Sequence, residues 1–179
     1  MKKILGLAFG VMAFSTSHAI VVNFDDLVGD NIAVPLNYSG IADMSNWTYY
    51  NFDQPPYNPS SGTCRVYNIG NSNITMGQDV IFGGAFFNGY GTANGFSPIS
   101  FEMYDNGNLV ATSGSIDLAG NGTGQFLASG YNGVVDQVKV LGTSGFYIMD
   151  DFTYDVVPEP ASMLVLGGGL VAILRRRKK

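Results

Sequence analysis

Short runs of alternating apolar and polar residues recur between residues 20 and 157, and Gly, Asn, Pro and Ser separate them. In 99–104, for example, the odd-numbered residues are Ile, Phe and Met, and the even-numbered ones are Ser, Glu and Tyr. Such alternation is typical of half-buried β-strands, and no convincing amphipathic helix appears in this region. The pattern predicts strands at residues 20–24, 47–52, 65–69, 79–82, 99–104, 109–112, 125–128, 134–141 and 146–154.

Turn signals support this all-β interpretation. Asn-Gly pairs begin at Asn88, Asn94, Asn106, Asn121 and Asn132. Asn-Gly is the preferred tight hairpin turn, and the pair in 105–108 lies between two alternating runs, so we expect a hairpin there. Residues 53–63 contain three prolines and no apolar alternation, which predicts a long surface loop. Regularly spaced short strands without helices favour a single antiparallel β-sandwich, of the jelly-roll type.

The N-terminal residues have a different pattern from the predicted sandwich. Lys2 and Lys3 precede an apolar run at 4–14, and Ser17-His18-Ala19 offers small residues at the cleavage positions. This order is typical of an export signal peptide, so we expect residues 1–19 to be removed. Residues 20–157 then form one domain of 138 residues, long enough to bury a core.

The C-terminal residues 158–179 combine Pro158-Glu159-Pro160, an uncharged apolar run at 161–174 and five consecutive basic residues. The predicted transmembrane helix at 161–174 would be about 21 Å long, against about 30 Å of bilayer hydrocarbon. The segment resembles the PEP-CTERM sorting tail of exported bacterial proteins, the substrate of the membrane protease exosortase. An ordinary membrane anchor is the alternative. The resemblance implies that Pro158, Glu159, Pro160, Arg175, Arg176 and Arg177 act in sorting and processing.

The two predicted signals together imply a route for the protein. We expect the Sec export machinery and exosortase as partners, and a precursor held transiently in the inner membrane by its C-terminal tail. The domain at 20–157 would first lie in the periplasm and then reach the cell envelope or the extracellular matrix.

The composition of residues 20–157 excludes several functions. Arg65 and Lys139 are its only basic residues against 13 acidic ones, a net charge of −11 that repels nucleic acid. The sole histidine, His18, lies in the predicted signal peptide, which excludes histidine-dependent catalysis and His-ligated metals in the domain. The sole cysteine, Cys64, has no partner for an intramolecular disulfide, and we interpret it as a small apolar strand residue.

Two acidic pairs lie near the two ends of the domain. Phe24-Asp25-Asp26-Leu27 stands near its start and Met149-Asp150-Asp151-Phe152 near its end. This framing is similar to a group of PEP-CTERM proteins whose ectodomains resemble galactose-binding-like sandwiches. The resemblance implies adjacent terminal strands that share a structural calcium. Adjacent strands would bring Asp25 or Asp26 near Asp150 or Asp151, and clustered carboxylates suit Ca²⁺, so these four residues are the candidate ligands. The alternative is that these aspartates are strand-edge charges. We expect no other cofactor.

Aromatic residues are the candidates for ligand binding. Sugar-binding sandwiches stack aromatic rings on pyranoses, and Trp47, Tyr49, Tyr50 and Tyr57 lie beside or within the proline-rich loop. The alternative is that Trp47 belongs to the core, since aromatics are common in strands.

The sequence thus predicts a non-catalytic binding module for extracellular polysaccharide. A purely structural matrix or surface protein is the alternative. A carboxylate-dependent glycoside hydrolase is less favoured, because Glu102 is the only glutamate in the domain and no aspartate pair stands out. We therefore predict that the protein is not an enzyme.

Overall fold

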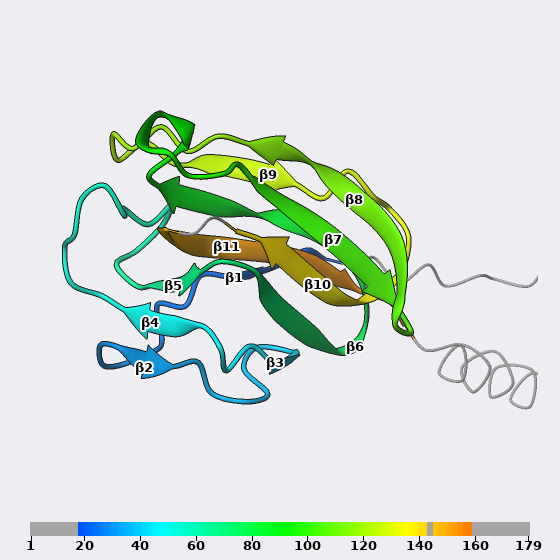
Figure 1. Cartoon of the computed structure of the whole chain (residues 1–179). Coiled ribbons are helices and arrows are strands. Elements are labelled where there is room, and N and C mark those ends of the chain that lie inside the picture. The colour runs from blue at the N-terminus through cyan, green and yellow to red at the C-terminus, as the bar shows by residue number, and fades with distance from the viewer. Residues whose placement is uncertain (1–17, 143–144, 159–179) are drawn as a thin grey trace, which may run out of the picture.

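The computed structural model describes residues 18–142 and 145–158, which form an antiparallel β-sandwich (Figure 1). No α-helix occurs in these residues, and Thr92–Asn94 forms one turn of 3-10 helix. The strands are β1 (Ile20–Val22), β2 (Ile32–Ala33), β3 (Ile41–Asp43), β4 (Thr48–Tyr50), β5 (Arg65–Ile69), β6 (Ser72–Gly89), β7 (Ile99–Asp105), β8 (Asn108–Ile116), β9 (Gln125–Ala128), β10 (Val135–Leu141) and β11 (Phe146–Val156). The predicted fold class is confirmed.

Strand β6 links the two parts of the sandwich because its two halves have different partners. Its first half pairs with β10 and β3, and β10 continues the sheet to β7 and β8. Its second half pairs with β11 and β9, and β11 continues to β5, β4 and β2. The register with β10 shifts between Val135 and Gln137, so β6 departs from regular pairing between its two halves.

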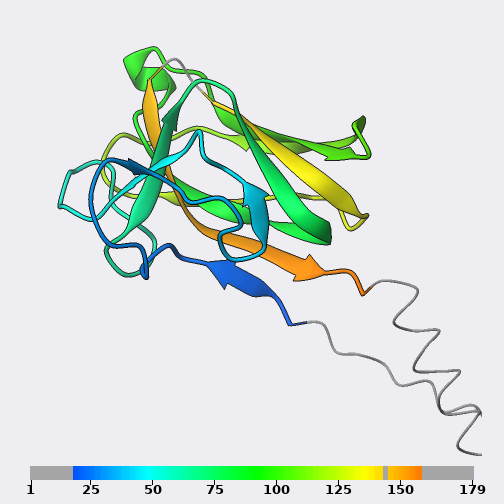
Figure 2. The ribbon, with the colours of Figure 1, turned by 90° about the horizontal axis from the view of Figure 1, so that it is seen from below.

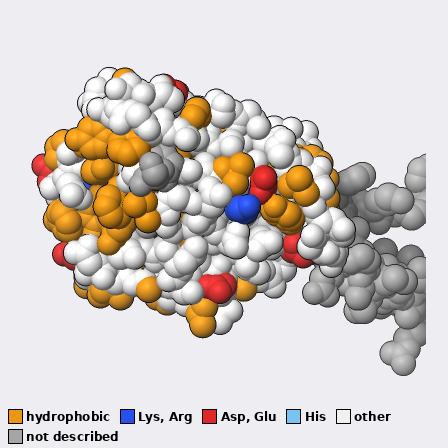
Figure 3. Space-filling model, in the orientation of Figure 1, with side chains coloured by type: hydrophobic (Ala, Val, Ile, Leu, Met, Phe, Trp, Pro, Cys, Tyr) orange, Lys and Arg blue, Asp and Glu red, His pale blue; other side chains and the backbone are white. Residues whose placement is uncertain are grey.

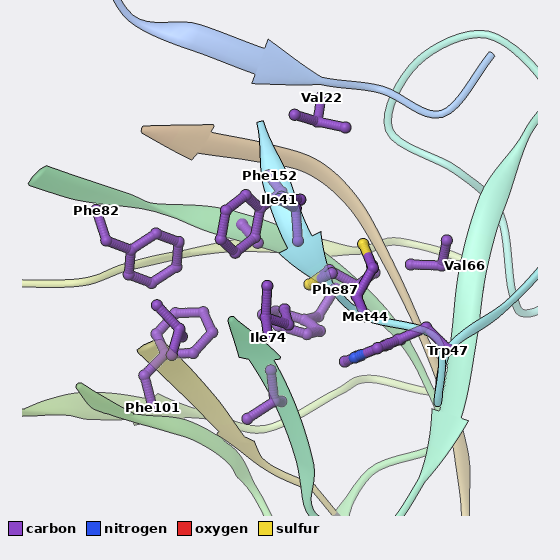
Figure 4. Packing of buried hydrophobic residues seen from close by; sticks show 14 of the residues in the cluster. Val22, Ile41, Met44, Trp47, Val66, Ile74, Phe82, Phe87, Phe101 and Phe152 are labelled. Carbon is purple, nitrogen blue, oxygen red and sulfur yellow. The ribbon is translucent and has the colours of Figure 1, made fainter. Parts of the chain in front are cut away.

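The core lies where the apolar faces of the strands meet (Figure 4). Phe82 and Phe87 of β6 both contact Phe101 of β7, with ring centroids 4.9 and 5.6 Å apart. Phe152 of β11 stacks on Phe82 at 4.8 Å. These rings are buried, and burying each apolar side chain of this size stabilises the fold by about 1.5–3 kcal/mol.

The turn predictions were confirmed at one Asn-Gly pair in particular. Asn106 and Gly107 have φ angles of 50° and 76° and join β7 to β8. Asn88-Gly89 instead lies at the end of β6, and Gly95 ends the 3-10 turn. The predicted strand at 79–82 is part of the much longer β6, and the short strands β2 and β3 were not predicted.

The first and last strands are neighbours, as the resemblance implied. Ile20 of β1 lies opposite Tyr154 of β11, and Val22 lies opposite Phe152. Figure 2 shows the two strands side by side. Pro158 is exposed at the end of the described region. Several predicted features lie outside the described residues. They are the signal peptide up to residue 17, the transmembrane segment at 161–174, and the sorting residues Glu159, Pro160, Arg175, Arg176 and Arg177. Within the described residues, no helix has the length and apolar character needed to cross a membrane.

Candidate functional site: an aromatic pocket beside the proline-rich loop

A pocket of about 240 Å³ opens on the outer face of β4, β5 and β11. It is lined by Asn31, Tyr50, Phe52, Gln54, Tyr57, Tyr67, Phe146 and Ile148. Figure 3 shows hydrophobic side chains gathered on the left of the molecule, at the end where β4 and β5 lie in Figure 1. The volume is below the roughly 300–1,000 Å³ of typical small-molecule pockets, which fits a shallow platform better than an enclosed site.

The register of β4, β5 and β11 places three lining residues, Tyr50, Tyr67 and Ile148, close together on one face of the sheet. Tyr67 of β5 lies opposite Ile148 of β11, and Tyr50 of β4 lies opposite Arg65, two residues before Tyr67. Because side chains alternate across a strand, these residues share the outer face. The intervening residues Tyr49 and Val66 point into the core.

Four aromatic rings contact one another along this face. Tyr50 contacts Phe52 and Tyr67, with ring centroids 4.8 and 5.5 Å apart, and Tyr67 contacts Phe146 at 5.8 Å. Phe52 and Phe146 are 43% and 51% exposed, so their rings are available to a ligand. Tilted and edge-on contacts of this kind hold rings in place and leave faces open.

Residues 51–64, which we call the pocket loop, form the other wall of the pocket. Phe52, Gln54 and Tyr57 belong to this loop, which joins β4 to β5 without a strand of its own. The prediction of a surface loop at 53–63 is confirmed. Tyr57 also meets the ring of Tyr90 edge-on, at 5.8 Å.

A buried cation lies directly behind the pocket. The guanidinium of Arg65 sits 4.1 Å from the centre of the Tyr50 ring, and Arg65 is 2% exposed. It donates to the carbonyl oxygens of Thr63 and Phe52, at 2.7 and 2.6 Å. Among the described residues the recorded ion pair is Lys139–Glu102, so the charge of Arg65 is met by the ring face and the carbonyl dipoles.

The predicted ligand-binding residues divide into two groups. Tyr57, which is half-buried, lines the pocket, and Tyr50, which is 2% exposed, forms its floor. Trp47 is wholly buried and meets Tyr147 edge-on at 5.7 Å, and Tyr49 is 5% exposed with its hydroxyl donating to the carbonyl of Val28. For Trp47 and Tyr49 the ligand-platform prediction is therefore wrong, because strand alternation turns both into the core.

The sequence prediction missed most of the pocket. The missed lining residues come from different segments of the chain, and they include Asn31, Gln54, Tyr67, Phe146 and Ile148. Alternation in 65–69 could have placed Tyr67 on the same face as Arg65, but the register between β5 and β11 is needed to add Phe146 and Ile148.

The four aspartates of the predicted calcium site all have hydrogen-bond partners. Asp25 accepts from the backbone of Thr63 and Cys64, and Asp150 from Ser60 and Ser61. Asp151 accepts from the Ser61 hydroxyl, and Asp26 from the Tyr38 hydroxyl. In the described part of the chain, no group of three or more His, Cys, Asp or Glu side chains could hold a metal ion. The calcium prediction has no support in this arrangement.

Asp150 is wholly buried, and its environment shifts its titration. Burial raises the pKa of Asp150 to about 7, and the nearby Asp151 charge adds to this rise. The amide donors of Ser61, Asp151 and Ser60 act in the opposite direction, because they favour the carboxylate.

The candidate catalytic glutamate is remote from the pocket lining. Glu102 accepts from Lys139 at 3.0 Å and from the Tyr104 hydroxyl at 2.8 Å, on β7 and β10. In the part of the chain that the structure describes, no aspartate or glutamate lines the pocket. Glycoside hydrolysis at this pocket would therefore lack the pair of carboxyl groups that it requires.

Comparison with known proteins identifies the tail. Residues 156–178 match the PEP-CTERM protein-sorting motif. The motif indicates an exported protein that exosortase processes and whose tail is anchored in the membrane before release. A search of curated proteins found no match.

Among solved structures, the fold is similar to a mutant of a family 29 carbohydrate-binding module, at 8% identity and a TM-score of 0.45, covering 78% of this chain and 92% of that one. It is also similar to TmCBM61 in complex with β-1,4-galactotriose, at 15% identity and a TM-score of 0.37, covering 71% and 98%. The enzymatically active domain of tailspike protein 4 of bacteriophage CBA120 gives 16% identity and a TM-score of 0.35, covering 72% and 21%. Similarities this low carry no argument about what this chain does.

Proposed function

We propose that this protein is an exported, non-catalytic binding module that takes up extracellular polysaccharide in the aromatic pocket. The observation that carries the proposal is a set of rings on one face, the exposed Phe52 and Phe146 and the half-buried Tyr67, beside the amides of Asn31 and Gln54. Aromatic rings offer apolar contact to the C–H faces of a sugar, and amides can both donate to and accept from its hydroxyls.

The absence of charge in the lining favours a neutral glycan. No charged side chain is among the described residues that line the pocket, whereas the domain as a whole carries −11. An anionic polysaccharide would be repelled by this surface, and a neutral one would not. The proposed place of action is the cell envelope or extracellular matrix, reached through the Sec machinery, the inner membrane and exosortase.

The test is a glycan array followed by calorimetry on the glycans that bind. Phe146→Ala should weaken binding about tenfold or more, because it removes an exposed ring from the pocket lining. Phe126→Ala is the matched control, since Phe126 is 53% exposed on β9 and is not part of the pocket lining.

Three results would count against the proposal. If Phe146→Ala and Phe126→Ala lost equal affinity for the glycan, the glycan would not bind at the aromatic pocket. No binding to any glycan on the array would favour a purely structural matrix or surface protein. Release of reducing sugar from a polysaccharide, lost on substitution of one carboxylate, would instead show a hydrolase.

A further inference from the structure

The pocket loop is fastened at its neck by Arg65. The two terminal guanidinium nitrogens of Arg65, Nη2 and Nη1, donate to the carbonyl of Phe52 near the start of the loop and to that of Thr63 near its end. One buried side chain therefore joins both limbs of the loop. Because Arg65 also packs on Tyr50, the neck is fixed relative to the floor of the pocket.

Two carboxylates, Asp25 just after β1 and Asp150 within β11, hold the returning limb of the loop. Oδ1 of Asp25 accepts from the amides of Thr63 and Cys64, at 2.8 and 2.9 Å. Oδ2 of Asp150 accepts from the amides of Ser60 and Ser61, at 2.8 and 3.0 Å. These four hydrogen bonds hold the returning limb at residues 60, 61, 63 and 64.

Gly62 shows how closely the loop approaches one of these carboxylates. Its φ is +51°, and a Cβ at this position would lie 1.8 Å from Oδ2 of Asp25. A side chain here would force the loop away from Asp25, so the close contact depends on glycine.

The tip of the loop is held separately. The Asn88 side chain donates to the carbonyls of Asn58 and Gly122, and Asn58 also donates to Gly122. Tyr57, which lines the pocket, thus lies between the fixed tip and the fixed neck.

From this geometry we infer that Asp25 and Asp150 are positioning residues for the aromatic pocket, holding the pocket loop in its binding conformation before a ligand arrives. The inference rests on the proposed function, because it assigns these aspartates to the same pocket. A loop that is already ordered loses less conformational freedom on binding, which favours affinity. It also gives the acidic pairs at the two ends of the domain a role that needs no metal ion.

The test compares Asp25→Ala with Asp25→Asn in the full-length protein by hydrogen exchange and mass spectrometry. Alanine removes the acceptor of two amides, so peptides from 51–64 should exchange about ten- to a hundredfold faster. Asparagine keeps a carbonyl oxygen that can accept both hydrogen bonds, so it should restore most of the protection. Asp150→Ala and Gly62→Ala should act like Asp25→Ala.

Asp136→Ala is the matched control. Asp136 also accepts a backbone hydrogen bond, from Asn106 at 3.0 Å, but at the β7–β8 hairpin. It should leave exchange in 51–64 unchanged. Unchanged exchange in 51–64 for both Asp25→Ala and Asp150→Ala would overturn the inference. So would equal acceleration over the whole domain, since that would show general destabilisation.

Glycan affinity is measured separately from hydrogen exchange in the pocket loop, so that the proposed function and the positioning role can be tested independently. Faster exchange in 51–64 with no glycan bound by the wild type would retain the loop anchoring and reject the proposed function. A bound glycan whose affinity is the same for wild type and Asp25→Ala would retain the proposed function and reject the positioning role.

Discussion

Asp25 and Asp150 stand 125 residues apart in the sequence, yet their carboxylates accept hydrogen bonds from consecutive parts of one loop. The pairing of β1 with β11 explains how they come together, because Asp25 follows β1 and Asp150 lies within β11. The acidic pairs therefore mark the point where the two ends of the domain meet beneath the pocket loop.

The titration of Asp150 should make the domain less stable as the pH rises from about 4 to about 7. Its pKa is raised from 3.8 to about 7, so the folded state binds more protons than the unfolded state between these values. The free energy of unfolding then falls with increasing pH across this window. Urea unfolding at a series of pH values should show this slope, and Asp150→Asn should reduce it. An identical slope in the variant would contradict the raised pKa.

Arg65 and Lys139, the two cations of the domain, should differ sharply in their contribution to stability. Arg65→Met removes two hydrogen bonds from a charged donor, to the carbonyls of Phe52 and Thr63, which should lower the free energy of unfolding by about 3 kcal/mol. Lys139 pairs with Glu102 with both side chains partly exposed, so Lys139→Met should cost only about 0.5 kcal/mol. Denaturant unfolding measures both, and similar losses would contradict the role assigned to Arg65.

The thiol of Cys64 should be unreactive in the folded protein. Cys64 is 1% exposed, and burial raises the pKa of its thiol to about 11, so the reactive thiolate is scarce at neutral pH. Iodoacetamide at pH 8 should leave the native protein unmodified and alkylate it fully in urea, as intact-mass measurement would show. Rapid alkylation without denaturant would mean that the start of β5 opens readily.

The β-architecture could be predicted from local patterns, and the predictions failed where a local pattern has two physical meanings. Asn-Gly can form a hairpin turn, but the same pair can also end a strand or a 3-10 turn. Asn106-Gly107 was recognisable because alternating strands flank it, whereas Asn88-Gly89 closes the long strand β6. The full length of β6 was not predicted because the strand contains several glycines, and glycine in a sequence usually indicates the end of a strand.

The pocket could be predicted only in part, because its residues are assembled by register. Trp47, Tyr49 and Tyr50 lie close together in sequence and are all aromatic, so composition alone does not say which side faces the core. The pairing of Tyr49 with Val66 and of Tyr50 with Arg65 decides it. Phe146 enters the pocket from a strand almost a hundred residues further along, and no local pattern could place it there.

The final prediction concerns the sorting tail. Strand β11 ends at Val156, and the amide of Val157 still donates to the carbonyl of Asp79, at 3.1 Å. The match to the sorting motif begins at residue 156, the last residue of β11, so no spacer separates the domain from the motif. In a host with exosortase, the mature protein should lose the basic cluster at 175–179 and should retain it when exosortase is deleted.

Replacing Pro158, Glu159 and Pro160 by alanine should leave the protein in the inner membrane, because the sorting signal is lost while the apolar and basic segments remain. Intact-mass measurement of protein from the membrane and from the matrix checks both expectations. Matrix protein that still ends at Lys179 would contradict processing of the tail. Inserting a short Gly-Ser segment after Val157 is the informative companion variant, because it separates Pro158-Glu159-Pro160 from the folded strand and leaves residues 158–179 unchanged. If the folded domain hinders access to the motif, this insertion should speed processing, and an unchanged rate would show that exosortase reaches the motif beside the folded strand.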